Sequence, residues 1–366
     1  MKYHGLTWDH PRGYNALAEA ESRGGPVHWD VQPLEGFESA PIAELCKRYD
    51  LVVMDHPHLG EALATDCLQP LENLLSPRDI DKIANGAVGP SFTSYQMRGK
   101  TWALPLDAAT QVMAIRSDLT EDVPTTWNEV VKLASAGKVA LPLAGPHVLM
   151  CLWSITAAVA PGLHMGDGRW PELKDLETAF EILAEVAASN PSELGAMNPI
   201  GILGHMVKHD DIAVIPLVYG YVNYADPALE KPVSFVDAPH VSDGYPGSII
   251  GGTGIAVSAR AEVSDALRDH LLWLLSPEAQ TGFIPAHDGQ PGLECAWLDD
   301  EVNQGSGDFY RNTIKTLRQS TVRPRHNGYI AFQTRVSAYL RDALTQRENG
   351  TTVAQTVTEM YHASRA

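Results

Sequence analysis

Two segments of the chain concentrate side chains that are able to bind ligands or transfer protons. Residues 8–12 (Trp-Asp-His-Pro-Arg) and residues 55–58 (Asp-His-Pro-His) each follow a short apolar run. Such side chains could hydrogen bond to a ligand, act as a general acid and base, or ligate a metal ion through His10, His56 and His58. The aspartates could also serve only as helix caps. We expect hydrogen bonding to a ligand, with no bound metal or other cofactor.

Aromatic and amide side chains form a third group at residues 219–224 (Tyr-Gly-Tyr-Val-Asn-Tyr), again after an apolar run. Aromatic rings stack on sugar rings, while amide and hydroxyl groups hydrogen bond to sugar hydroxyls. Tyr219 and Tyr221 are therefore candidates for a carbohydrate site. The alternative is a strand at the protein surface with one tyrosine buried.

Three further polar segments could contribute to the same site. Asp107 and Gln111 lie between two apolar runs, where they could reach a ligand or only hold the backbone. Gly252 offers a backbone N–H that no side chain screens, next to the hydroxyl of Thr253, although the glycine could only permit a bend. Arg323 could pair with a carboxylate of the ligand through two hydrogen bonds, or lie in solvent.

Alternating strands and helices must position these groups. Short apolar runs predict strands at residues 3–8, 27–34, 51–54, 139–143, 212–218 and 233–236. The first three are separated by helical stretches, which is typical of βαβ units with a parallel sheet. Ligands of open α/β sheets bind beyond the carboxyl ends of the strands, where residues 8–12 and 55–58 would lie.

A longer pattern extends from residue 97 to residue 129. Residues 97–118 contain a Gly-Lys turn, an apolar run that includes Pro105, a polar joint and a second apolar run. The joint predicts that one strand leaves a sheet at 101–106 and that another enters a second sheet at 111–115. A helix follows, with Thr126 as its expected N-cap and Glu129 at the capping-box position.

This order of elements resembles the extracellular solute-binding proteins of ABC importers, in the branch that mostly handles sugars. The Gly-Gly strand at 248–258 and the Ser-Pro-Glu-Ala-Gln helix start at 276–280 resemble the same family. The resemblance implies an α/β, periplasmic-binding-protein-like II fold with two lobes, each a mixed or mostly parallel sheet flanked by helices, joined by a two-segment hinge. Lobe 1 would comprise residues 1–107 plus 252–310, and lobe 2 residues 108–251 plus 311–366.

The resemblance further implies a binding protein rather than an enzyme. A sugar, polyol or sugar acid would be clamped in the cleft between the lobes, and the protein would work as a monomer with ABC permease subunits. The loop after the 276–280 helix often forms a wall of the family's ligand site. The side chains and glycine expected to bind the ligand are Trp8, Asp9, His10, Arg12, Asp55, His56, His58, Asp107, Gln111, Tyr219, Tyr221, Gly252, Thr253, Asp288, Gln290 and Arg323.

An enzyme on the same fold is the alternative, because a fold does not fix a function. It would be a cytoplasmic enzyme or ligand sensor that uses His10, His56 and His58. The first residues run directly into the first predicted strand, without the apolar core of a signal peptide. We expect a periplasmic protein if the chain is exported, whereas a cytoplasmic location would favour the alternative.

The composition excludes several other classes of protein. The 366 residues suit two domains, and 45 acidic residues against 27 lysines and arginines give a net charge of −18. This charge disfavours nucleic acids and anionic membrane surfaces as partners. The sequence has no apolar run long enough to span a membrane, no Walker loop, no dinucleotide fingerprint and no nucleophile elbow. Its four cysteines are expected to be free thiols, or to include a Cys46–Cys67 disulfide in an exported protein.

Overall fold

The computed structural model describes residues 2–121, 123–241 and 244–365. The chain divides into two compact units, each assembled from three segments. Unit 1 comprises Met1–Ala109, Gly251–Val302 and Arg325–Gly328, and unit 2 comprises Thr110–Ile250, Asn303–Pro324 and Tyr329–Ala366. Two strands, β6 (Leu104–Ile115) and β9 (Ile250–Val257), carry the chain from one unit into the other.

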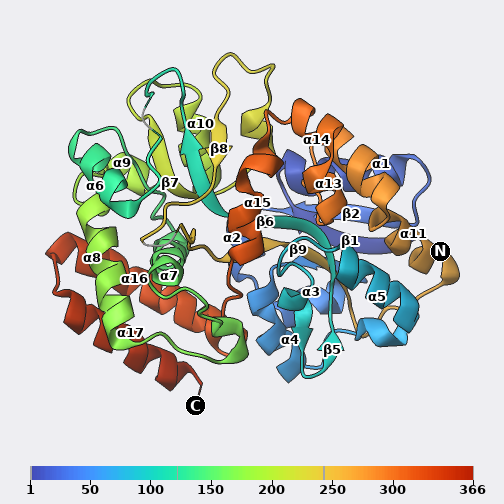
Figure 1. Ribbon diagram of the computed structural model, residues 1–366. Coiled ribbons are helices and arrows are strands. Elements are labelled where there is room, and N and C mark those ends of the chain that lie inside the picture. Colours follow the sequence, from blue (N-terminus) through green and yellow to red (C-terminus); the bar gives the residue numbers. More distant parts are fainter. Residues whose placement is uncertain (1, 122, 242–243, 366) are drawn as a thin grey trace. The chain divides into compact units, whose positions relative to one another are not determined.

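Unit 1 is built on a mixed sheet with the strand order β2-β1-β3-β9-β6 (Figure 1). β1 (Tyr3–Trp8) runs parallel to β2 (Val27–Gln32) and β3 (Leu51–Met54), whereas β9 runs antiparallel to β3. The strands predicted at 3–8 and 51–54 are confirmed. Every residue of β3 is apolar because the strand is buried in the middle of the sheet.

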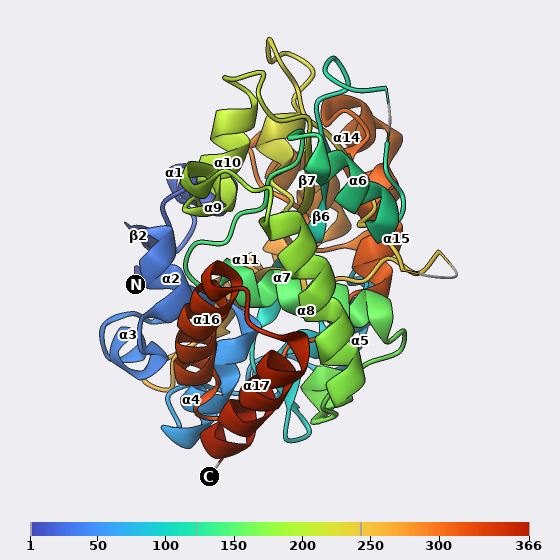
Figure 2. The same cartoon turned by 90° about the vertical axis from the view of Figure 1, so that its left-hand side faces the viewer.

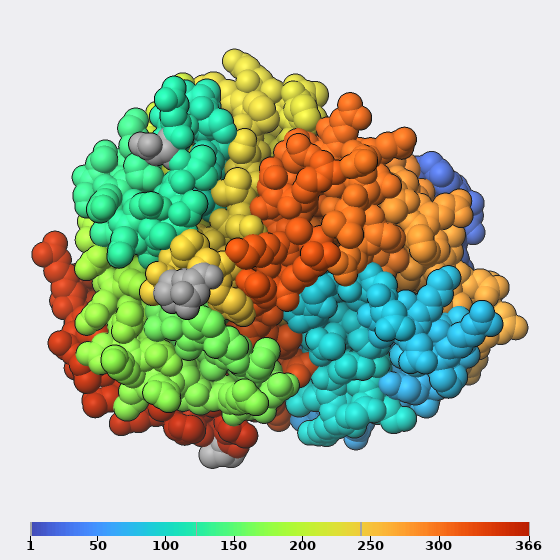
Figure 3. All heavy atoms as spheres, in the orientation of Figure 1, coloured from blue at the N-terminus to red at the C-terminus, as the bar shows by residue number. Residues whose placement is uncertain are grey.

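Helices connect the parallel strands of unit 1, as crossover connections require. α1 (Pro11–Ser22) leads from β1 to β2, and α2 (Leu34–Ser39) with α3 (Ile42–Arg48) leads from β2 to β3. On the face seen in Figure 3, residues 70–100 (blue to cyan) and 265–305 (orange) form the outer surface of unit 1. The remaining elements are η1 (His56–His58), α4 (Leu59–Ala64), η2 (Leu71–Asn73), α5 (Pro77–Gly86), η3 (Thr93–Tyr95), β4 (Gln96–Met97), β5 (Lys100–Thr101), α11 (Asp265–Leu274), η6 (Ala279–Phe283), α12 (Ile284–Ala286) and α13 (Glu294–Leu298), and α14 (Asp300–Gly305) begins in unit 1.

Unit 2 surrounds the second half of β6, which pairs antiparallel with β7 (Val214–Tyr219) and β8 (Ser234–Val236). Its core is centred on α7 (His147–Val159), whose residues His147 to Ala158 are all buried. This burial around the whole helix explains why the sequence is apolar without a helical period there. The other helices of unit 2 are α6 (Trp127–Ser135), η4 (Met165–Asp167), α8 (Leu173–Ala187), α9 (Ser192–Gly195), α10 (Pro199–Met206), η5 (Val222–Ala225), α15 (Phe309–Gln319), α16 (Tyr329–Gln346) and α17 (Gly350–Ser364).

Helices α7, α8, α16 and α17 pack against one another in unit 2 (Figure 2). Aromatic contacts join them: the Trp153 indole N–H donates to the hydroxyl of Tyr329, with 3.2 Å between the heavy atoms. The rings of Trp170 and Tyr361 stack with 3.7 Å between their centroids. The C-terminal segment of the chain is therefore part of the core of unit 2.

The predicted interruption between two strands is wrong. Residues 101–106 and 111–115 were expected as two strands with a polar joint, but β6 is a single strand that includes the joint. The polar side chains in it do not interrupt the strand because they find partners inside their own unit. Asp107 pairs with Arg12 in unit 1, and the Thr110 hydroxyl donates to the carbonyl oxygen of Ile249 in unit 2.

The strand predicted at 139–143 is also wrong, since only a single parallel bridge joins Val139 to Val214. The side chain of Asn190 takes the place of a neighbouring strand. Its Oδ1 accepts from the Leu141 backbone N–H at 3.1 Å, and its Nδ2 donates to the Leu141 carbonyl oxygen at 3.0 Å. Pro142 has no backbone N–H, so the chain leaves the sheet after Leu141.

The capping box of α6 is confirmed. The Thr126 hydroxyl accepts the Glu129 backbone N–H at 3.3 Å, and the Glu129 carboxylate accepts the Thr126 backbone N–H at 3.0 Å. All four cysteines are free thiols. Within the described part of the chain, no helix is both long and apolar enough to cross a membrane.

Candidate functional site

Three neighbouring strands of unit 1 bring predicted site residues to one edge of the sheet. Leu6 lies opposite Val52, and Met54 lies opposite Gly254. Asp9 directly follows β1, Asp55 directly follows β3, and Thr253 directly precedes Gly254 on β9. We call these three residues, together with His10, the unit 1 edge.

His10 is the N-cap of α1, and its imidazole ring is uncharged near neutral pH. Its Nδ1 accepts the backbone N–H of Arg12 at 3.1 Å, so the ring proton of the neutral imidazole lies on Nε2. Burial and, to a lesser extent, the positive charge of Arg12 lower the pKa of His10 to about 4, against the opposing effect of Asp288. Near neutral pH, the ring is therefore uncharged and carries its proton on Nε2.

Asp288 lies close to His10 in unit 1. It has a left-handed backbone conformation, with φ of 62°, and its Oδ2 accepts from the Asn15 side chain at 2.7 Å. Asn15 was not among the expected site residues. The helix begins at Pro11, which places Asn15 about one turn after the cap.

Only the aspartate of residues 55–58 reaches the unit 1 edge, with 15% of its side chain exposed. Its Oδ1 accepts the His56 backbone N–H at 2.8 Å and lies 3.0 Å from the His56 Nδ1. His56 and His58 are buried, and the His56 ring packs against the edge of the Tyr95 ring at 6.4 Å between centroids. The aspartate therefore caps η1, and both histidines lie in the interior.

Four residues that were expected to contact the ligand are instead buried in unit 1, where they pack against or bind other protein groups. Arg12 and Asp107 make a buried, two-pronged ion pair, with Nε–Oδ2 and Nη2–Oδ1 both at 2.6 Å. Trp8 is buried against Phe37, with 5.2 Å between ring centroids, and Gln290 donates to the Ala108 carbonyl oxygen at 2.7 Å. These residues line a cavity of about 10 Å³, which has room for about one water molecule and none for a sugar.

Gly252 and Thr253 lie where β9 passes β6. Gly252 has φ of +87°, and a Cβ there would lie 2.4 Å from the Asp107 carbonyl oxygen, so only glycine fits. Thr253 is 3% exposed, and no described residue hydrogen bonds to its hydroxyl. A buried hydroxyl without a partner is unfavourable by about 1–3 kcal/mol, so this oxygen is suited to a ligand hydroxyl or a water.

The remaining candidates belong to unit 2, where two are buried among structural partners. Gln111 accepts from the Ser154 hydroxyl at 2.7 Å, and its amide lies 3.7 Å from the Cys151 sulfur. Arg323 is buried and donates to the Gln333 side chain at 3.4 Å.

The two tyrosines of unit 2 differ in exposure. Tyr219, the last residue of β7, is half-buried, and its ring meets the His147 ring at 6.3 Å. Tyr221 is buried. The expected convergence of the unit 1 and unit 2 residues on one ligand stays a prediction.

Residues 42–291 match the family model of bacterial extracellular solute-binding proteins. The chain belongs to this family. The match spans more than half of the 366 residues and confirms the resemblance seen in the sequence. No curated protein is significantly similar to this solute-binding protein in sequence.

Solved structures confirm the fold. An ABC transporter solute-binding protein from Agrobacterium radiobacter, in complex with ribitol, has a TM-score of 0.81 at 20% identity, covering 100% of this chain and 98% of that chain. One from Thermotoga lettingae, bound with α-D-tagatose, has a TM-score of 0.80 at 12% identity, covering 100% of both chains. One from Agrobacterium vitis, with bound D-mannitol, has a TM-score of 0.73 at 15% identity, covering 99% and 98%.

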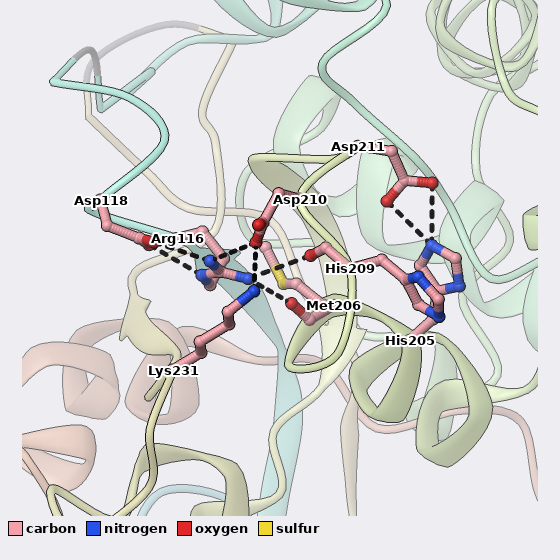
Figure 4. A network of polar contacts seen from close by, with 8 residues as sticks. All are labelled: Arg116, Asp118, His205, Met206, His209, Asp210, Asp211 and Lys231. Carbon is pink, nitrogen blue, oxygen red and sulfur yellow. Dashed lines mark hydrogen bonds and ion pairs between the residues drawn. The ribbon is translucent and has the colours of Figure 1, made fainter.

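The solute-binding protein also contains a polar network that was not predicted from the sequence (Figure 4). Arg116 follows β6 directly and is fully buried. It binds Asp118 through two hydrogen bonds of 2.7 and 2.6 Å, Asp210 at 2.8 Å, and the carbonyl oxygens of Met206 and His209 at 2.6 and 3.1 Å. A cation at these carbonyls stabilises the C-terminal end of α10. The only sequence signal is an Arg-Ser-Asp triplet after an apolar run.

Two other features of this solute-binding protein lie apart from the unit 1 edge. A surface cavity of about 440 Å³ in unit 1 is lined by α5, α11 and α13, and none of the expected ligand residues lines it. No group of three or more His, Cys, Asp or Glu side chains within residues 2–121, 123–241 and 244–365 is arranged to hold a metal ion.

Proposed function

We propose that this chain binds a neutral polyol or monosaccharide, unchanged, and delivers it to the permease of an ABC importer as a monomeric periplasmic protein. Membership of the solute-binding family supports a binding role. Similar folds bind ribitol, α-D-tagatose and D-mannitol, which supports this class of ligand. The observation that carries the proposal is the buried Thr253 hydroxyl, which has no partner among the described residues and precedes Gly254, the residue that pairs with Met54 at the end of β3.

The unit 1 edge suits a chain of hydroxyl groups. A polyol hydroxyl is both a donor and an acceptor, so it can donate to the carboxylates of Asp9 and Asp55 and accept from the Nε2–H of His10. The Thr253 hydroxyl can take either role. Charge-assisted hydrogen bonds to carboxylates are stronger than those between neutral groups.

The charges at the edge favour a neutral ligand over a sugar acid. Asp9, Asp55 and Asp288 are carboxylates, whereas the nearby guanidinium of Arg12 is occupied by Asp107. Arg323, which was expected to pair with a ligand acid, is buried next to Gln333. In unit 2, we propose the half-buried ring of Tyr219 as the surface on which the ligand's carbon skeleton packs.

An enzyme that uses His10, His56 and His58 finds less support. His56 and His58 are buried, and His10 is bound through Nδ1 to its own helix. Recovery of the ligand separates the two functions: a binding protein releases its ligand with an unchanged mass spectrum, whereas an enzyme releases a product.

A thermal-shift screen followed by calorimetry tests the proposal. Ribitol, D-mannitol and D-tagatose should raise the melting temperature, since a ligand at 100 times its Kd stabilises the folded state by about 2.7 kcal/mol. Thr253→Val, which keeps the shape of the side chain, should weaken binding at least about tenfold. The matched control is Thr93→Val at an exposed position, which should bind as the wild type does. No shift with any polyol or sugar, or equal loss in both variants, would contradict the proposal.

A further inference from the structure

The dipeptide Asn-Gly occurs three times in the chain, at residues 85–86, 327–328 and 349–350. In such a pair the backbone nitrogen of the glycine can attack the side-chain amide of the asparagine, because the glycine has no side chain that hinders the approach. The reaction is intramolecular, so it depends on whether the two groups are free to meet. The three pairs of this chain differ in that freedom.

Two of the pairs are held by helices. Gly86 is the last residue of α5, so its backbone N–H lies within the hydrogen-bond ladder of that helix. Asn349 is the N-cap of α17, and its Oδ1 accepts the Thr351 backbone N–H at 2.9 Å. This hydrogen bond fixes the Asn349 side chain, and with it the amide group that would have to react.

The third pair, Asn327–Gly328, has neither restraint. Asn327 is exposed in a turn that precedes α16, and Gly328 has φ of +103°. Among the residues that the structure describes, none accepts the Gly328 backbone N–H and none hydrogen bonds to the Asn327 side chain. Both reacting groups of this pair are therefore available.

We propose that Asn327 is a site of spontaneous deamidation, which converts it to a mixture of aspartate and isoaspartate. The Gly328 nitrogen loses its proton to solvent and bonds to the side-chain amide carbon of Asn327, and the amide nitrogen takes up a proton and leaves as ammonia. Water then opens the succinimide ring at either carbonyl. Opening at the side-chain carbonyl gives aspartate, whereas opening at the backbone carbonyl gives isoaspartate, whose main chain is longer by the Cβ atom. Overall, water is consumed and ammonia is released.

The backbone at this site has little room for a longer main chain. Residues 325–328 belong to unit 1, whereas the chain on both sides of them belongs to unit 2. A Cβ at Gly60 of α4 would lie 2.2 Å from the Arg325 carbonyl oxygen and 2.4 Å from the Asn327 backbone nitrogen, so the two segments touch through their backbones. The Arg325 Nη1 donates to the Gln96 carbonyl oxygen at 2.7 Å, which anchors the segment. Isoaspartate should therefore destabilise the protein, whichever ligand it binds.

Incubation of the purified full chain in mildly alkaline buffer, followed by proteolysis and mass spectrometry, tests the site. The Asn327 peptide should lose its amide and separate into aspartate and isoaspartate forms, while the Asn85 and Asn349 peptides keep their amides. In urea all three should react, because the helices that protect two of them are lost. Conversion of Asn85 or Asn349 ahead of Asn327 in the folded protein, or reaction of Asn327 only in urea, would overturn the proposal.

Two variants identify the reacting residue. Asn327→Gln has a longer side chain that closes the ring far less readily, so the folded variant should release no ammonia over the time in which the wild type reacts. Asn85→Gln, also at an exposed position, is the matched control and should leave the reaction at Asn327 unchanged. Equal ammonia release by the Asn327→Gln variant and the wild type would contradict the assignment.

A comparison of melting temperatures tests the effect on the fold. Deamidation adds a negative charge, so anion exchange separates the modified protein from the unmodified one. The isoaspartate form should melt at least about 2 °C lower than the Asn327→Asp variant, which has the same charge and an ordinary main chain. Equal melting temperatures would show that the segment accommodates the longer backbone, and would overturn this part of the proposal.

Discussion

Arg12 and Asp107, 95 residues apart in the sequence, form a two-pronged ion pair in the interior of unit 1, with side chains only 4% and 3% exposed. The pair joins the first turn of α1 to the middle of β6. Both charges are satisfied, so each depends on the other: a single charge left in this place would be buried without its counterion.

Asp107→Ala should therefore destabilise the protein by about 3–5 kcal/mol, because it leaves a buried guanidinium unpaired. The double variant Arg12→Met, Asp107→Leu should lose much less, since it removes both charges. Urea unfolding measures both. Arg23→Ala, which breaks an exposed pair with Glu19, is the control and should change stability by no more than about 1 kcal/mol. A double variant as unstable as Asp107→Ala would contradict this account.

His10 should make stability depend on pH. Its pKa is about 4 in the folded protein, mainly because of burial, against a usual value of 6.5. The unfolded chain binds the proton more tightly, so the stabilisation is complete above pH 6.5 and is lost as the pH falls towards 4. The loss is at most about 3 kcal/mol.

His10→Asn keeps a capping side chain and removes the titrating group, so its stability should fall less between pH 6.5 and 4 than that of the wild type. Urea unfolding at several pH values measures the difference, and NMR titration of the His10 ring gives the pKa directly. His4→Asn, at an exposed position, is the control. A His10 ring that titrates near 6.5 would refute the prediction.

Gly252→Ala should destabilise unit 1 by at least about 2 kcal/mol. The residue has φ of +87°, and the new Cβ would lie 2.4 Å from the Asp107 carbonyl oxygen. Gly99→Ala is a matched control, because Gly99 has φ of +72° with nothing within 4 Å of the added atom. The difference between the two variants measures the close approach of β9 to β6, and equal effects would show that only backbone strain matters.

Local patterns predicted β1, β3 and the capping box because each depends on neighbouring residues: an apolar run for a buried strand, and two side chains three apart for the cap. The Arg12–Asp107 pair has no such signal, since its members meet only through the fold. The same holds for Asn190, which replaces a strand next to Leu141, and for the buried Arg116. The sequence indicated polar residues at strand ends, but not which of them would turn inwards.

The last prediction concerns ligand charge. Asp9 follows β1 and Asp55 follows the neighbouring parallel strand β3. A unit charge roughly 4 Å from a carboxylate in water interacts with it by about 1 kcal/mol. The protein should therefore bind ribitol at least about tenfold more tightly than ribonate, its acid analogue. Asp9→Asn keeps the shape of the side chain and removes one charge. It should therefore reduce the ratio of ribitol affinity to ribonate affinity, mainly by improving ribonate binding.

Calorimetry of both ligands at low and high salt measures the ratio, which should shrink at high salt because exposed charges are screened. Asp81→Asn, an exposed aspartate on α5, removes the same charge elsewhere and should leave the ratio unchanged. If Asp81→Asn changed the ratio as much as Asp9→Asn, the overall charge of −18 would be responsible and the edge carboxylates would not. Tighter binding of ribonate by the wild type would instead require a cationic group within reach of the ligand, and the proposed neutral-ligand site would be wrong.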